Sequence, residues 1–153
     1  MKKNFKTLLQ RFFIALVLTA SSQITLGQSI SASKIFEFLQ HQQTSKIVAD
    51  LTSKQFKYMT TNTNSSYGIT LKEYSKEGSL GKENFTFGKN NELFMIIYHP
   101  ATSATFEAYK TKFLTADFGY AYSYKDTKYF ENGSMRIGIN EVRCNLSFFC
   151  KLN

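Results

Sequence analysis

"LTSKQFKYMTT" (residues 51–61) and "LTADFGYAYSY" (residues 114–124) repeat one pattern at two distant places in the chain. Each reads Leu-Thr, then a short polar spacer, then Phe-x-Tyr, so Phe56 corresponds to Phe118. Such an internal repeat is informative, because a duplicated unit determines the architecture of a whole domain.

The segments that follow these two also correspond. "FTFGKNNELFMIIYH" (residues 85–99) and "IGINEVRCNLSFFCK" (residues 137–151) each read as an apolar strand, a polar turn with asparagine and a second apolar strand. Apolar residues at helical spacing predict two short helices before the first unit and one helix, ending near Leu114, before the second.

The predicted order is therefore two helices and four strands, then one helix and four strands. Short connections make neighbouring strands antiparallel. The sequence thus predicts an α+β fold: two helix-plus-antiparallel-meander repeats, about residues 31–100 and 101–153, forming one curved sheet with helices on one face. Together the repeats make a single domain, residues 28–153. Strands are expected near residues 56–61, 67–74, 84–88, 92–98, 118–124, 127–131, 134–140 and 143–151.

This order resembles the beta-lactamase inhibitor protein fold, in which tandem helix-plus-four-strand repeats form one curved antiparallel sheet. Small outer-membrane assembly lipoproteins have a related design. The chain departs from the inhibitor family by lacking a disulfide in each repeat and a second helix in repeat two. Its overall look is also similar to uncharacterised exported proteins of Bacteroidetes-type bacteria. The resemblance rests on Leu51, Phe56 and Tyr58 and on their counterparts Leu114, Phe118 and Tyr120.

The first 27 residues are typical of a secretory signal peptide. A basic start precedes the apolar run "FFIALVLTA" (residues 12–20), which is shorter than the ~18 residues of a spanning helix. Thr25 and Gly27 suit cleavage before Gln28, and Ala20 with Ser22 is the alternative pair. We therefore expect a periplasmic or extracellular protein with no stable membrane span after cleavage. An uncleaved membrane anchor is the competing interpretation.

Charge argues against nucleic acid as a partner. Without residues 1–27 the net charge falls from +8 to +4, because that segment holds four basic and no acidic residues. The remaining charges are scattered singly, whereas nucleic-acid binding needs a basic stripe.

Cys144 and Cys150 are expected on one strand, which would hold them ~20 Å apart, too far for a disulfide.

Signatures of the common enzyme classes are missing from the sequence. It contains no Gly-x-Ser-x-Gly elbow, phosphate loop or dinucleotide fingerprint. His41 and His99 do not stand at metal-ligand spacing from Cys, Asp or Glu. We therefore expect a non-enzymatic protein without metal or cofactor, and a hydrolase with dispersed carboxylates ranks last.

The strand "ELFMIIYHP" (residues 92–100) is apolar on both faces. If Met95 is aligned with Phe148 of the second unit, the even-numbered residues of the strand point away from the helices. An exposed apolar patch usually marks an interaction site. The predicted partner-binding residues are Phe94, Ile96 and Tyr98, joined by Phe149 on the same face and by Tyr122 and Tyr124 at its rim.

The sequence thus favours an exported binding module that contacts a protein partner through the open face of its sheet. An inhibitor, an immunity protein and an envelope adaptor all fit this description. The alternative is a carrier of a small apolar ligand such as a lipid, enclosed by the curved sheet.

Export can be tested at the amino terminus. Protein recovered from the cell envelope should begin near Gln28, because the basic, apolar and polar regions of a signal peptide are all present. N-terminal sequencing measures this directly. A sequence that starts at Met1 would contradict cleavage and restore the net charge of +8.

Overall fold

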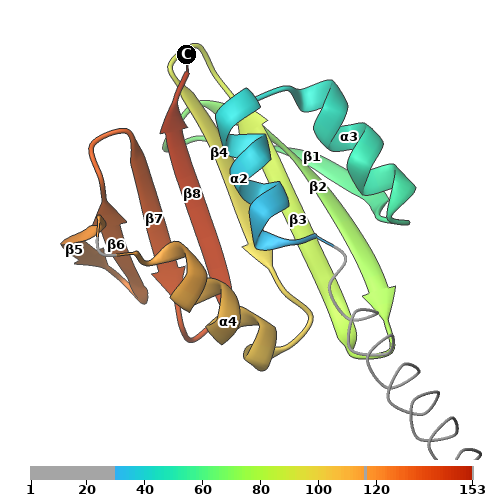
Figure 1. Cartoon of the computed structure of the whole chain (residues 1–153). Helices are drawn as coiled ribbons and strands as arrows, with labels where there is room; N and C mark the ends of the chain where they lie inside the picture. The colour runs from blue at the N-terminus through green and yellow to red at the C-terminus, as the bar shows by residue number, and fades with distance from the viewer. Residues whose placement is uncertain (1–29, 116, 153) are drawn as a thin grey trace, which may run out of the picture.

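The computed structural model describes residues 30–115 and 117–152. The predicted signal peptide, residues 1–27, lies outside the described residues. The described residues form three helices and one eight-stranded antiparallel sheet, so the predicted α+β class is confirmed. The helices lie on one side of the sheet (Figure 1).

Two helices come first in the described chain. Helix α2 spans Ala32–His41 and helix α3 spans Thr44–Ser53. The hydroxyl of Ser31 accepts a hydrogen bond from the backbone N–H of Lys34 at 3.2 Å, which satisfies one of the free donors at the start of α2. Gln42 ends this helix with a left-handed backbone, φ 51°.

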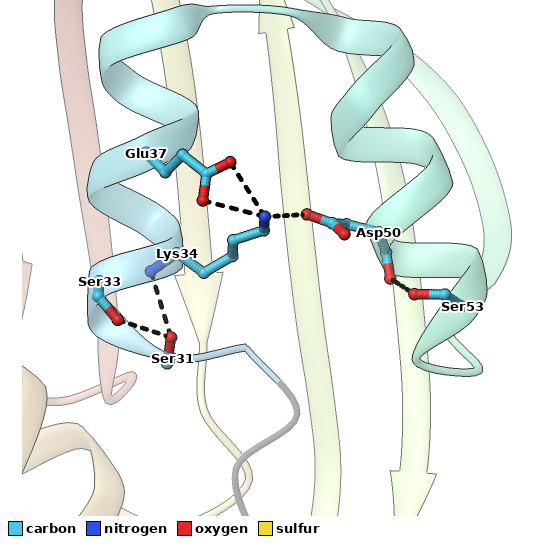
Figure 2. Close-up of polar contacts among 6 residues, drawn as sticks. All are labelled: Ser31, Ser33, Lys34, Glu37, Asp50 and Ser53. Carbon is cyan, nitrogen blue, oxygen red and sulfur yellow. Dashed lines mark hydrogen bonds and ion pairs between the residues drawn. The ribbon is translucent and has the colours of Figure 1, made fainter.

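Lys34 ties these two helices together (Figure 2). Its ammonium group lies 2.7 Å from a carboxylate oxygen of Asp50 on α3 and 3.0 Å from one of Glu37 on α2. Hydrogen bonds to Asp50 and then to Glu37 raise the pKa of Lys34. These side chains are still partly open to solvent, so the ion pairs contribute little to stability.

Four strands follow as a meander, and helix α4 leads into a second meander. Helix α4 spans Ser103–Phe113, and Thr102 caps it by accepting from the backbone N–H of Thr105 at 3.1 Å. The strands are β1 (Lys57–Asn64), β2 (Ile69–Gly78), β3 (Gly81–Lys89), β4 (Leu93–His99), β5 (Gly119–Tyr124), β6 (Thr127–Glu131), β7 (Met135–Asn140) and β8 (Asn145–Lys151).

The last strands of the two meanders pair with each other. The order across the sheet is β1-β2-β3-β4-β8-β7-β6-β5, which leaves the first strand of each meander at an edge. The main core lies between the helices and the near face of the sheet. Its largest fully buried side chains include Phe85, Phe87, Phe94, Tyr98, Phe106, Phe113 and Phe148, and Ile96 is buried with them.

The two edge strands are built alike. Each has a register shift after its first tyrosine, in β1 after Tyr58 and in β5 after Tyr120. Tyr58 packs edge-on against Tyr74 at 5.6 Å, and Tyr120 packs edge-on against Phe130 at 5.9 Å. Each hydroxyl also bonds a hydroxyl three residues later. Their likeness agrees with the matched segments, although a duplication of the whole unit stays a prediction.

Both cysteines are free thiols. Cys150 is buried in β8, and burial raises the pKa of its thiol to about 11. The prediction that Cys144 shares this strand is wrong, because Cys144 lies in the preceding turn with φ 49°. Its thiol contacts the carbonyl oxygen of Glu141 at 3.6 Å.

The matched phenylalanines are buried to different degrees. Phe56 is 4% exposed in the main core, whereas Phe118 packs against that core and is only partly buried. Phe56→Ala should therefore cost about 3–5 kcal/mol of unfolding free energy, and Phe118→Ala about 1–2 kcal/mol. Urea unfolding of both variants measures this, and equal costs would contradict the different packing.

Candidate functional site: the open face of the sheet

The pairing of β4 with β8 decides which residues face the helices. Ile96 lies opposite Phe148, and Phe94 lies opposite Cys150. Directly opposed residues of antiparallel strands point to the same side. The even-numbered residues of β4 therefore belong to the helix side, together with the core residues of β8.

The expectation that Phe94, Ile96 and Tyr98 point to the open face is therefore wrong. They are 0%, 0% and 1% exposed and belong to the main core. The sequence alignment placed Met95 against Phe148, one position out of phase, and a one-residue shift exchanges the two faces of a strand.

A buried polar contact accompanies Tyr98. Its hydroxyl donates a 2.6 Å hydrogen bond to the carboxylate of Glu83, which is 4% exposed. Burial and then the charge of Glu83 raise the pKa of Tyr98 far above its usual range. Tyr109 of α4 lies beside it, with ring centroids 5.3 Å apart. Burial raises the pKa of Tyr109 to about 12, so both phenols stay protonated at neutral pH.

The open face carries a second apolar cluster, which we call the trough. None of the helices in the described part of the chain lies on this face (Figure 1). Met95 and Phe149 are 4% and 5% exposed at its centre, although only strands and one turn surround them. The trough consists of Tyr67, Ile69, Leu71, Leu93, Met95, Ile97, Tyr129 and Phe149.

The sheet bends toward this face between β2 and β3. Gly88 follows the core residue Phe87, so a Cβ added to Gly88 would project into the open side, where it would overlap the backbone carbonyl of Thr70 on β2. The neighbouring strand thus rises above β3 on the open side. Tyr67, in the turn between β1 and β2, reaches Phe149 on β8 with ring centroids 5.5 Å apart. The trough is therefore concave.

Aromatic rings run across the trough to the far edge of the sheet. Phe149 lies 6.2 Å from Tyr129, and Tyr129 stacks on Tyr122 at 4.8 Å with ring planes 21° apart. The guanidinium of Arg136 lies 5.5 Å from the centre of the Tyr122 ring, a cation–π distance. Arg136 also donates a 2.5 Å hydrogen bond from its Nε to Glu131.

Two shallow depressions open at the end of the trough near the chain's last strand. One has a volume of about 310 Å³ and is lined by Tyr67, Leu93, Arg136, Phe149 and Lys151, among others. The other, of about 660 Å³, shares Tyr67, Leu93 and Lys151 with the first. Apolar and aromatic walls with charged groups of both signs at the rim suit contact with another molecule.

Three predicted site residues lie on the exposed side of the sheet. Phe149 is in the trough, and Tyr122 is 39% exposed beside it. Tyr124 is 61% exposed and alternates with Tyr122, so it lies on the same face. Their role in binding a partner stays a prediction.

Sequence reasoning missed Tyr67 and Tyr129, and it assigned Leu93, Met95 and Ile97 to the wrong face. A usable signal existed for Tyr129. Residues 125 and 126 form a two-residue hairpin turn, which pairs Tyr122 with Tyr129. No such signal existed for Tyr67, because its position depends on the bend at Gly88.

The described residues, 30–115 and 117–152, show no group of three or more His, Cys, Asp or Glu side chains that could hold a metal ion. Within the same residues, no helix is long and apolar enough to cross a membrane. No protein-family model, curated protein or solved structure matches the chain. The resemblance to the beta-lactamase inhibitor fold thus stays a prediction that rests on the order of elements.

Neighbouring isoleucines of β4 provide a matched test of the two faces. Ile96→Lys places a charge in the main core, where Ile96 is 0% exposed, and should cost roughly 3–5 kcal/mol. Ile97→Lys places the same charge at the half-buried rim of the trough, where the lysine stem can reach solvent, at about 1 kcal/mol. Urea unfolding measures both. If Ile97→Lys is the more damaging change, the assignment of faces is wrong.

Proposed function

We propose that this protein is an exported, non-enzymatic binding module that contacts a protein partner through the trough. The supporting observation is an apolar and aromatic cluster on the sheet face that the described helices leave uncovered. Sheets that expose one face normally carry polar residues there. An apolar face with a polar rim is the usual mark of an interaction surface.

The composition of the trough supports a protein partner. Tyrosine, phenylalanine, methionine and arginine are enriched at protein interfaces, and tyrosine and arginine dominate the binding energy there. Tyr67, Tyr122 and Tyr129 present ring surface at the trough, and Arg136 lies against Tyr122. Export rests on the signal-like residues 1–27. An inhibitor, an immunity protein or an envelope adaptor would each use such a face.

A carrier of a small apolar ligand is the second candidate. The depression of about 310 Å³ beside Phe149 is at the lower limit of the volumes that bind small molecules, which are ~300–1,000 Å³. Its rim holds Lys151 and the ion pair of Arg136 with Glu131, so an apolar ligand with a single acidic group placed near Lys151 would fit best. The open shape of the trough favours the protein partner.

The proposal can be tested by affinity capture from envelope extracts of the source cells. Ile97→Lys should weaken partner binding by at least about tenfold, because it places a charge on the apolar contact surface. Tyr129→Ala should weaken it as well, since it removes the ring that lies against Phe149. Binding by the immobilised variants is compared with wild type by quantitative mass spectrometry.

Val142→Lys is the matched control. Val142 is a 78% exposed aliphatic residue in the turn between β7 and β8, outside the trough, so the same added charge should leave binding unchanged. A partner that binds Ile97→Lys as well as wild type would exclude the trough as the functional surface. Recovery of a lipid by solvent extraction of the purified protein, without a protein partner, would favour the carrier instead.

A further inference from the structure

A cavity lies at the edge of the sheet where β2 continues beyond its neighbour β1. Strand β1 begins at Lys57, which lies opposite Ser75, so the residues of β2 from 76 to 78 pair with β3 alone. The cavity at this step has a volume of about 600 Å³, and we call it the notch. It shares no lining residue with the trough. The charged residues that line the notch are Lys57, Lys76, Lys82 and Glu77.

The notch is basic, because three lysines and one glutamate give it a net charge of +2. Within the described part of the chain, none of these lysines forms an ion pair. Lys82 lies opposite Glu77 in the pairing of β2 with β3, so it offsets that carboxylate. Lys57 and Lys76 remain to attract an anion.

Two further carboxylates lie close to the notch without lining it. Glu73 precedes Ser75 by two residues on the same side of β2. Glu83 lies opposite Lys76, but it is buried and accepts the hydrogen bond of Tyr98. The lining itself therefore keeps its positive charge.

Uncharged donors also line the notch. Ser75 is 6% exposed, and its hydroxyl oxygen has no hydrogen-bond partner among the described residues. An unpaired buried hydroxyl is costly, so a ligand that accepts from it gains affinity. The turn at 79–80 closes with Gly78 opposite Gly81, and such a closing pair is hydrogen-bonded. Hydrogen-bonding direction alternates along a strand, so the N–H of Glu77 points away from β3 and toward the notch.

We propose that the notch binds a phosphate group, with Lys57, Lys76 and Ser75 as side-chain donors. A phosphate group carries about two negative charges at neutral pH, which matches the net charge of the notch, and its oxygens accept hydrogen bonds from several directions. A carboxylate carries a single charge and would leave some of these donors unpaired. The group is either a free phosphate ion or the head group of a phospholipid. This inference is independent of the partner proposed for the trough.

The first test is calorimetric titration of sodium phosphate, at low ionic strength, into protein purified from cells that express the full chain. Wild type should bind one phosphate per chain, and sodium acetate more weakly. Lys57→Gln and Lys76→Gln should each weaken phosphate binding by about tenfold, because each removes a charged donor. Lys128→Gln is the matched control, since Lys128 is an exposed lysine on β6, far across the sheet, and should leave binding unchanged.

Two results of this titration would overturn the proposal. One is the absence of saturable phosphate binding by wild type, with neither a free ion nor vesicles. The other is an equal loss of binding in Lys128→Gln and Lys57→Gln, which would mean that phosphate responds only to the overall charge of the protein.

Ser75→Ala tests the role of the hydroxyl. It should weaken phosphate binding severalfold, because the ligand loses a donor. Asn84 lies opposite Ser75, and its side-chain oxygen is also unpartnered among the described residues. Unchanged binding by Ser75→Ala would therefore assign both groups to a bridging water and overturn the proposed donor set. The exposed lysine variants keep the test decisive if Ser75→Ala fails to fold.

Cosedimentation with vesicles distinguishes the two sources of phosphate. Vesicles of phosphatidylcholine are compared with vesicles that also contain phosphatidic acid, whose head group is a phosphate monoester. Binding only to the second kind, reduced in Lys57→Gln and kept in Lys128→Gln, identifies a phospholipid head group. Phosphate binding in solution without vesicle binding identifies the free ion.

Discussion

The hydrogen-bonded pairing of β4 with β8 is the constraint on which the rest of the structure depends. The two meanders meet at this pair of strands, and its register places Ile96 opposite Phe148 and Met95 opposite Phe149. The first pair lies beneath the helices, where Phe113 of α4 packs on Phe148 with ring centroids 4.6 Å apart. The second pair forms the centre of the trough. One register therefore fixes both the core and the candidate surface.

A sheet with helices on one side must still keep its other face stable in water. Here the open face partly covers itself. Tyr67 and Tyr129 lie on either side of Phe149, and the bend at Gly88 brings β2 over β3. The central residues are buried by their own neighbours, while the outer rings stay half-exposed. Rings held in this way lose little freedom when another molecule binds, which favours affinity because less ordering is needed.

Much of the architecture could be read from the sequence because it depends on local patterns. Apolar residues at helical spacing locate α4, and the matched Phe-x-Tyr segments locate the two edge strands. The faces of β4 could not be read in the same way. Every residue from Leu93 to Tyr98 is apolar, so alternation carries no phase information, and only the partner strand determines it.

Less of the candidate site than of the fold could be predicted from the sequence. Phe149 alternates out of phase with the core residues of β8, so its side of the sheet follows from its own strand. Tyr122 and Tyr124 alternate in phase with Tyr120, and only the register shift between Tyr120 and Tyr122 places them on the open face. Tyr67 stands in a turn, and its contact with Phe149 arises from the curvature of the sheet. Curvature is a property of several strands together, and no single stretch of sequence encodes it.

Gly88 has a consequence for how this surface can diverge among descendants of the protein. Any larger residue there would collide with the carbonyl of Thr70 and push β2 away from β3. Such a change would flatten the trough and move Tyr67 away from Phe149, while every side chain that lines the trough kept its identity. The shape of the surface and its chemical composition are thus encoded at separate positions, so evolution can alter one without the other.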